Sequence, residues 1–230
     1  MGAIAIIQAR MGSTRLSGKV LMKVDERNPV LYYVINQLQY SKLLDKVIVA
    51  TTTLKEDDEI GEFVNGMGID CFRGDALNVL DRYYQCAKKF SVPTIVRITS
   101  DNPLIDPLIV DQVIKKFNSG LYDYVTNTQP RTFPQGTEVE VFSFQALERA
   151  WTEAKKPSER EHVTPYFYNP PTKFKIFNVL YLKDISHLRW TVDKQSDLDL
   201  VRIIASKIKK RPILMTDIID LLSKEPHLVK

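Results

Sequence analysis

The sequence predicts an α/β fold in which helices cover both faces of a parallel, doubly wound sheet. Its opening apolar run, residues 3–7, is bounded by glycine and has the composition of a strand that is buried on both faces. Strand and helix patterns then alternate through the first half of the chain, as in right-handed β-α-β units. With 230 residues and 44% hydrophobic content, the chain can bury one full core, and a single domain over residues 1–230 is expected.

The elements of the first half follow from local signals. Three predicted helices begin at a cap: Asn28 before Pro29, a capping box over Thr53–Glu56, and Asp106 before Pro107. Apolar residues recur at helical spacing behind each cap, and also between residues 80 and 87. The predicted strands between these helices are 3–7, 47–50, 69–72 and 94–98.

The second half changes character. Two strand-like runs, 122–125 and 137–142, are joined by a segment rich in turn formers, so residues 122–142 are expected to form a hairpin-like excursion over the active face. A second capping box is predicted at Ser158–Glu161. Late strands are expected at 174–179 and 187–192, and an amphipathic helix at 196–209.

Composition narrows the classes of partner. The net charge is only +4, so positive charge is local, which favours an anionic ligand in a pocket over a surface that coats nucleic acid. Cys71 and Cys86 are isolated and have no CxxC spacing, as expected for reduced thiols in a cytoplasmic protein. The opening apolar stretch is too short for a signal peptide or a membrane span, so no membrane partner is expected.

A basic, glycine-containing segment directly follows the first strand. Its glycines allow tight turns, its hydroxyls can donate hydrogen bonds, and no acid stands nearby to neutralise its cations. This is the chemistry of a polyphosphate cradle. A solvated basic loop would have the same composition, but the position after a buried strand favours the cradle. The residues concerned are Arg10, Gly12, Ser13, Thr14, Arg15, Gly18 and Lys19.

Other polar residues follow the later strands. Thr51 follows the second strand, Arg73 and Gly74 the third, and Asp101 the fourth. In a doubly wound sheet, ligands bind outside the carboxyl ends of the strands, so these residues are expected to face one crevice.

These segments resemble a known family. Gln8-Ala9-Arg10 followed by residues 13–19 is similar to the signature of cytidylyltransferases that make CMP-activated acidic sugars, and most similar to their spore-coat polysaccharide branch. Residues 100–105 resemble the family's Gly-Asp-x-Pro-Leu-Ile segment. Two positions depart from the pattern: Ser17 stands where the family usually has proline, and Ser100 where it usually has glycine.

The resemblance implies a glycosyltransferase-A-like nucleotidyltransferase fold, with a mostly parallel sheet and one reversed strand. It implies CTP as one substrate, a small acidic sugar or polyol as the other, and Mg²⁺ as cofactor, for cell-surface or spore-coat polysaccharide synthesis. It is compatible with a homodimer. Its functional residues correspond here to Gln8, Ala9, Arg10, Ser13, Thr14, Lys19, Thr51, Arg73 and Gly74 for the nucleotide, Arg10, Arg15, Lys19 and Asp101 for catalysis, Asp101 and Asp193 for the metal, and Arg160, Glu161 and His162 for the acceptor.

Two other classes of function remain open from the sequence. A sugar-1-phosphate nucleotidylyltransferase or a glycosyltransferase on the same fold would differ in its acceptor. A non-catalytic nucleotide-binding or nucleic-acid-binding protein would bind its ligand without releasing pyrophosphate.

If Asp101 and Asp193 approach each other as bare carboxylates, replacing either with Asn should leave the melting temperature of the metal-free protein unchanged or slightly raised.

Overall fold

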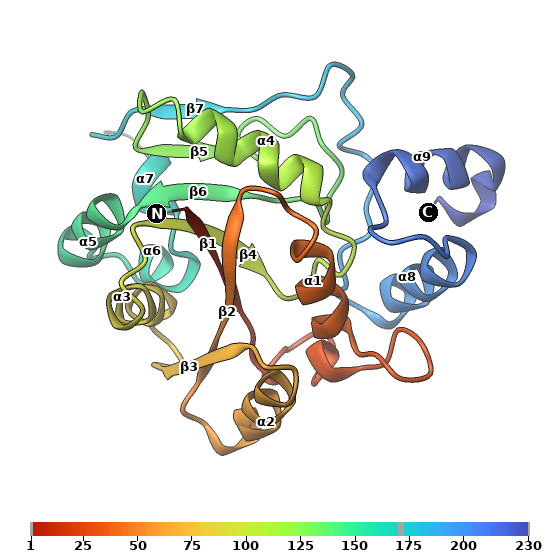
Figure 1. The fold of residues 1–230 in the computed structure, drawn as a ribbon, viewed down its shortest axis with the longest axis horizontal. Coiled ribbons are helices and arrows are strands. Elements are labelled where there is room, and N and C mark those ends of the chain that lie inside the picture. The colour runs from red at the N-terminus through yellow and green to blue at the C-terminus, as the bar shows by residue number, and fades with distance from the viewer. Residues whose placement is uncertain (1, 170–172, 230) are drawn as a thin grey trace.

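A computed structural model describes residues 2–169 and 173–229 and contains a seven-stranded sheet (Figure 1). Strand β6 runs antiparallel to both of its neighbours, and the other adjacent strands are parallel. The expected α/β fold with a mostly parallel, mixed sheet is therefore confirmed. The strand order is β3 (Asp70–Gly74), β2 (Leu44–Thr52), β1 (Ala3–Gln8), β4 (Thr94–Thr99), β6 (Glu140–Ser143), β5 (Tyr124–Thr126) and β7 (Ile176–Asn178).

Strand β1 lies in the interior of the sheet because its side chains can be buried on both sides. Ala5, Ile6 and Ile7 are fully buried, and they alternate between two hydrophobic cores, one on each face. Ile6 lies opposite Ile48 of β2 on one side and Arg97 of β4 on the other.

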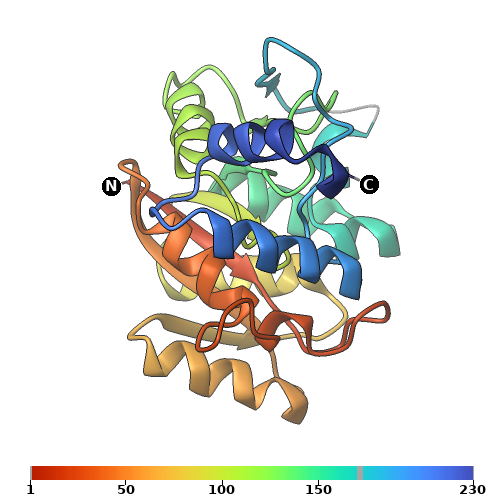
Figure 2. The same cartoon turned by 90° about the vertical axis from the view of Figure 1, so that its right-hand side faces the viewer.

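Helices cover both faces, in three layers with the sheet. Apolar residues from one group of helices pack into the core that contains Ala5 and Ile7, and those from another group face the core that contains Ile6. Helices α8 and α9 lie side by side on the α1 side of the molecule (Figure 2). The first group is α1 (Val30–Leu38), α2 (Asp58–Gly66), α4 (Pro107–Phe117), α8 (Gln195–Lys207) and α9 (Met215–Lys224); the second group is α3 (Val79–Lys89), α5 (Phe144–Glu153) and α7 (Pro165–Tyr168). Helix α6 (Pro157–His162) contacts α3 on the second face.

The predicted cap of α4 is confirmed, because the Asp106 carboxylate accepts a hydrogen bond from the backbone N–H of Leu108 at 2.7 Å. The predicted cap of α1 is wrong: the cap is Pro29, and the Asn28 side chain instead donates to Asp25. A local capping motif fails when a neighbouring acid offers the polar side chain a better partner.

Both predicted capping boxes are wrong in register. At the start of α2, a 3₁₀ turn, η2 (Lys55–Asp57), comes first, and the Thr52 hydroxyl accepts from Leu54 N–H. At α6, Lys156 is the cap, and Glu159 accepts from its backbone N–H at 3.3 Å. Each motif lies near a real helix start, but the proline or the 3₁₀ turn shifts the first helical residue.

The strand predicted at 187–192 is also wrong. This segment makes a single bridge, between Arg189 and Gln135. Its backbone binds two different partners: Trp190 N–H donates to Gln135, and Val192 N–H donates to the carbonyl of Asp101 at 2.8 Å. A segment that divides its hydrogen bonds in this way cannot form a ladder. No helix among the described residues is long and apolar enough to cross a membrane.

Candidate active site

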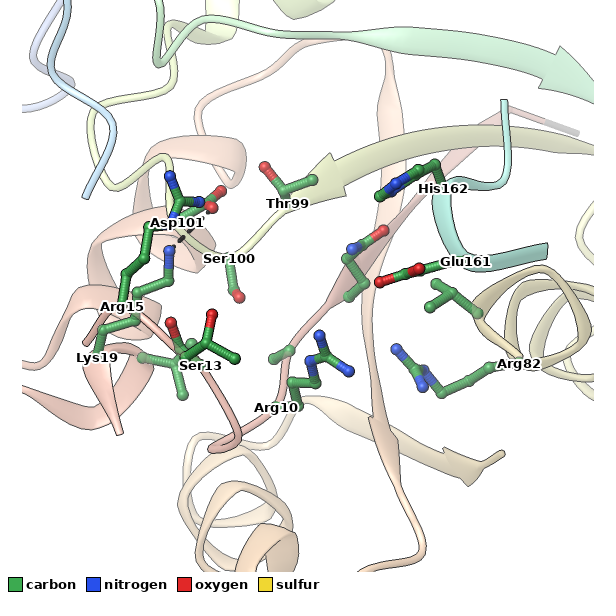
Figure 3. Close-up of a pocket in the computed structure, with 15 residues that line it drawn as sticks. Arg10, Ser13, Arg15, Lys19, Arg82, Thr99, Ser100, Asp101, Glu161 and His162 are labelled. Atoms are coloured by element: carbon green, nitrogen blue, oxygen red, sulfur yellow. Dashed lines mark hydrogen bonds and ion pairs between the residues drawn. The ribbon is translucent and has the colours of Figure 1, made fainter. Parts of the chain in front are cut away.

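A cavity opens at the carboxyl ends of β1 and β4, where the parallel sheet was expected to bind its ligand (Figure 3). One end holds Arg15, Lys19 and Asp101, and the other holds Arg82, Glu161 and His162. The cavity is lined by Gln8, Ala9, Arg10, Ser13, Thr14, Arg15, Lys19, Val20, Val79, Arg82, Thr99, Ser100, Asp101, Glu161 and His162.

A buried carboxylate shapes the basic loop after β1. Asp57 is fully buried and accepts a hydrogen bond from the backbone N–H of Met11 at 2.6 Å, while the Thr52 hydroxyl donates to its other oxygen. The carbonyl of Met11 accepts from Ser13 and from Gly18, at 2.8 and 2.9 Å. Gly18 has φ +66°, a conformation that glycine adopts without strain. The loop therefore turns back on itself and delivers Lys19 at the start of the 3₁₀ turn η1 (Lys19–Leu21).

The Lys19 ammonium lies between two aspartates from distant parts of the chain. Its Nζ donates to Asp101 Oδ2 and to Asp193 Oδ1, both at 3.1 Å, and to the carbonyl of Val192 at 2.6 Å. The Arg15 guanidinium also pairs with Asp193 Oδ1, at 2.7 Å. Burial alone would raise the pKa of Asp193, but hydrogen bonds from Arg189 and Lys19 outweigh it and hold that pKa below its ordinary value.

These two carboxylates fit a hard cation. Both direct an oxygen at the Lys19 ammonium, so the structure already has a cation between them, and carboxylate oxygens are the ligands that Mg²⁺ prefers. No group of three or more His, Cys, Asp or Glu side chains suited to a metal exists among residues 2–169 and 173–229. A Mg²⁺ ion held here would therefore take most of its other ligands from water or from a bound phosphate.

The opposite end of the cavity contains a buried arginine. Arg82 is 1% exposed; its Nη1 donates to the carbonyl of Asp75, and its Nε has no partner among the described residues. Desolvation lowers the pKa of Arg82, and the nearby positive charge of Arg10 lowers it further. The buried oxygen Oε1 of Gln8, which lines the same cavity, is likewise unpaired within the described part of the chain. Unpaired buried polar atoms at a cavity wall suit a polar ligand.

Several residues predicted for the site lie outside the cavity. Arg73 pairs with Asp58 and donates to the carbonyls of Thr52 and Leu54, so its guanidinium holds η2 against β3. Arg160 donates to the carbonyl of Trp151 at 3.3 Å, away from its neighbours Glu161 and His162. Asp193 does not line the cavity but reaches it through Lys19.

The other two residues outside the cavity are Thr51 and Gly74. Thr51 is fully buried in β2. Gly74 has no room for a side chain, since a Cβ would lie 2.8 Å from Phe72 and 3.1 Å from Arg82. Gly74 therefore permits the close packing of β3 against the helix that carries Arg82.

The site residues predicted from the sequence do not include Arg82, Thr99 and Asp57, although the Asp81-Arg82 pair is a weak candidate by its place after the third strand. Arg82 had a detectable signal: it lies on the apolar face of α3 with Val79, Tyr83 and Cys86, where an arginine is rare unless it has a polar partner. Thr99 ends β4 just before Ser100 and Asp101, and position alone would have found it. No local signal distinguishes Asp57 from an ordinary helix-start carboxylate.

The chain is similar to known proteins over almost its whole length. A family model described as cytidylyltransferase matches residues 4–212. An uncharacterized protein of Methanocaldococcus jannaschii is 41% identical, with 99% of this chain and 93% of that protein covered. The spore coat polysaccharide biosynthesis protein SpsF of Bacillus subtilis is 31% identical, with 96% of this chain and 94% of that protein covered.

Solved structures are similar as well. The structure of a cytidylyltransferase from Leptospira borgpetersenii serovar Hardjo-bovis superposes with a TM-score of 0.94 at 34% identity, covering 100% of this chain and 97% of the other. A CMP:2-keto-3-deoxy-manno-octonic acid synthetase complexed with CTP shares the fold, with a TM-score of 0.67 at 16% identity over 90% of this chain and 99% of the other.

Proposed function

This chain belongs to the cytidylyltransferase family, and from that premise we propose that it transfers CMP from CTP to a hydroxyl of a small acidic sugar or polyol, releasing pyrophosphate. The observation that carries the proposal is the cavity, which has Asp101 and Lys19 at one end, with Asp193 paired to that lysine, and unpaired polar atoms of Gln8 and Arg82 in its wall. The synthesis of a cell-surface or spore-coat polysaccharide is the process we propose, on the likeness to SpsF.

In this proposal the loop after β1 binds the triphosphate. Arg10, Arg15 and Lys19 line one cavity, so their positive charges sum where a polyanion would lie. When the bond to the α-phosphate breaks, negative charge accumulates on the pyrophosphate. Fixed cations that face this charge lower the barrier because they need no reorganisation at that moment.

Asp101 and Asp193 are the residues that would hold Mg²⁺. The bound ion would supply neutralisation of phosphate charge at the reacting centre. Lys19 forms ion pairs with the same two carboxylates. Its ammonium thus links Asp101 and Asp193, whereas Arg15 of the same loop pairs with Asp193.

The end of the cavity with Glu161 and His162 is where we place the acceptor. A carboxylate accepts hydrogen bonds from sugar hydroxyls, and an imidazole can donate or accept. Arg10 and Arg82, which line the same cavity, supply positive charge for the acidic group of the acceptor. Arg160 has no part in this proposal, since its guanidinium is directed at α5. A cytoplasmic location fits the two free thiols, Cys71 and Cys86.

The test is pyrophosphate release, measured with each of the four nucleoside triphosphates and Mg²⁺ against a panel of sugar acids, polyols and sugar phosphates. We expect CTP with a free-hydroxyl acceptor to be used. Activity only with a phosphate monoester would instead identify a sugar-1-phosphate nucleotidylyltransferase. Binding of nucleotide without pyrophosphate release from any acceptor of the panel would argue against catalysis.

A thermal-shift experiment tests nucleotide choice independently of the acceptor. A ligand present at about 100 times its dissociation constant adds about 2.7 kcal/mol to the free energy of unfolding. For a chain of this length that raises the melting temperature by about 5 to 10 °C. CTP with Mg²⁺ should give the largest increase of the four nucleotides, and equal increases would contradict the choice of cytidine.

A further inference from the structure

The two oxygens of Asp193 have separate partners. Oδ1 faces Lys19 at 3.1 Å and Arg15 at 2.7 Å, on the side of the cavity. Oδ2 accepts a hydrogen bond from Arg189 Nη2 at 3.0 Å. The orientation of Oδ1 toward the cavity therefore depends on the group that binds Oδ2.

The Arg189 guanidinium makes two further side-chain contacts. Nη2 also donates to Asp197 Oδ2 at 3.0 Å, and that oxygen accepts the backbone N–H groups of Asp193 and Lys194, at 2.9 and 3.1 Å. Nη1 donates to the side-chain oxygen of Gln135 at 2.9 Å. The guanidinium thus fixes Asp193 from one side and the start of α8 from the other.

Gln135 comes from the segment 127–139, which connects β5 to β6. Its backbone N–H donates to the carbonyl of Leu188, and its carbonyl accepts from the N–H of Trp190, both at 2.9 Å. Gln135 is therefore hydrogen-bonded to the backbone on both sides of Arg189. The packing is tight at the next residue, where a Cβ on Gly136 would lie 2.7 Å from the Trp190 ring. The position of Arg189 is therefore determined by this connection and not by its own local chain.

The same segment also contacts the neighbour of the other aspartate. Glu138 Oε2 accepts from Asn102 Nδ2 at 2.9 Å, and Asn102 directly follows Asp101. Residues 127–139 therefore touch both segments that carry a predicted metal ligand.

We propose that Arg189, held by Gln135, is a positioning residue that aims the Asp193 carboxylate at the cation between Asp101 and Asp193. This inference rests on the metal site of the proposed function and goes beyond it by naming the groups that orient the ligand. Outer groups that hold a metal ligand in place typically change metal affinity by about 10- to 100-fold when they are removed.

A purely structural role for Arg189 predicts a different result. Loss of the arginine would then lower the melting temperature, but the folded molecules would bind a divalent cation as the wild type does. Affinity for the cation, measured on folded protein, separates the two roles.

The experiment uses the full chain and Mn²⁺, whose free form is followed by electron paramagnetic resonance, with and without CTP. Arg189→Gln removes the charge and leaves a shorter polar side chain. Arg189→Lys keeps the charge but presents a single donor atom in place of the planar fork, whose Nη1 binds Gln135 and whose Nη2 binds the two aspartates. Arg202→Gln is the matched control, because Arg202 is an arginine of α8 paired with Asp199 at 3.1 Å.

We expect Arg189→Gln to weaken Mn²⁺ binding by about 10- to 100-fold, Arg189→Lys to have an intermediate effect, and Arg202→Gln to have none. In steady-state assays with Mg²⁺, kcat should fall while the KM for CTP changes less than twofold. If Arg189→Gln does not fold, the Arg189→Lys protein carries the test, and its metal affinity must fall for the proposal to stand.

Wild-type Mn²⁺ affinity in both folded Arg189 variants, or an equal loss in Arg202→Gln, would overturn the positioning role. A wild type that binds no Mn²⁺ under either condition would overturn the metal site and the positioning role together. A wild type whose Mn²⁺ affinity depends on Arg189, yet which releases no pyrophosphate from CTP, would overturn the proposed reaction and leave the positioning role standing.

Discussion

Asp101 and Asp193 accept hydrogen bonds from the same ammonium group, that of Lys19, each at 3.1 Å. The backbone supports this arrangement, because Val192 N–H donates to the carbonyl of Asp101 at 2.8 Å. The loop after β1, the end of β4 and the start of α8 therefore meet at one cation. Two consequences for Lys19 and for Asp193 can be tested separately.

Replacing Lys19 with Met should produce opposite effects on catalysis and on metal binding. The positive charge that faces the leaving pyrophosphate is lost, so kcat should fall by about 10²-fold or more. In the absence of nucleotide, the two carboxylates lose their competing cation, so their affinity for Mn²⁺ should rise. Steady-state kinetics and Mn²⁺ titration measure the two effects. A kcat equal to that of the wild type would mean that the basic segment is a solvated surface loop without a catalytic role.

Asp193→Asn should destabilise the metal-free protein. The expectation that bare carboxylates repel each other does not apply, because Lys19, Arg15 and Arg189 already pair with Asp193. Loss of these charge-assisted hydrogen bonds should lower the free energy of unfolding at pH 7 by about 1 to 3 kcal/mol.

The loss of stability caused by Asp193→Asn should become smaller as the pH falls. The pKa of Asp193 is lowered from 3.8 in the folded chain, so its contribution is fully present above that value and is lost as pH falls below it toward the folded pKa. Urea unfolding at pH 7 and at about pH 3 should therefore show a smaller difference between Asp193→Asn and wild type at the lower pH. A difference that grows toward acid pH would contradict the assignment of these ion pairs.

The sequence-based predictions succeeded where the signal was local. The apolar run that forms β1 and the cap at Asp106 depend on neighbouring residues alone, and both are confirmed. The strand predicted at 187–192 failed because its partners, Gln135 and Asp101, come from distant segments.

In the candidate site, too, position along the chain could be used for prediction, and contacts between distant segments could not. The loop cations and Asp101 line the cavity because residues that follow parallel strands share one edge of the sheet. The directions of Arg73 and Arg160 could not be predicted, since each guanidinium is drawn to carbonyl groups that only the folded chain brings near. For Arg82 the helical spacing indicates burial, but only the folded chain shows that it is buried beside the cavity.

Arg82→Met tests whether the buried guanidinium serves a ligand. Its Nε is unpaired in the described structure, so an apolar side chain of similar length should leave the free energy of unfolding unchanged within about 1 kcal/mol, or raise it. The kcat/KM for pyrophosphate release should fall by about 10-fold or more, because a charged donor at the ligand is lost. Strong destabilisation with normal activity per folded molecule would instead mean that Arg82 stabilises the fold through its hydrogen bond to the carbonyl of Asp75.

Glu161→Gln and Arg160→Met distinguish two adjacent residues of α6 that the sequence assigned to the same task. Glu161 lines the cavity, whereas Arg160 donates to the carbonyl of Trp151 outside it. Glu161→Gln removes a charged acceptor for sugar hydroxyls, so the KM for the acceptor should rise by about 10-fold with little change in melting temperature. Arg160→Met should leave that KM unchanged and lower the melting temperature by a few degrees, since it loses only a bond between α6 and α5.

Kinetics with the acceptor identified by the pyrophosphate assay, together with thermal unfolding of both variants, provide the measurement. The reverse pattern, with the acceptor KM dependent on Arg160 and not on Glu161, would mean that α6 turns toward the cavity when substrate binds.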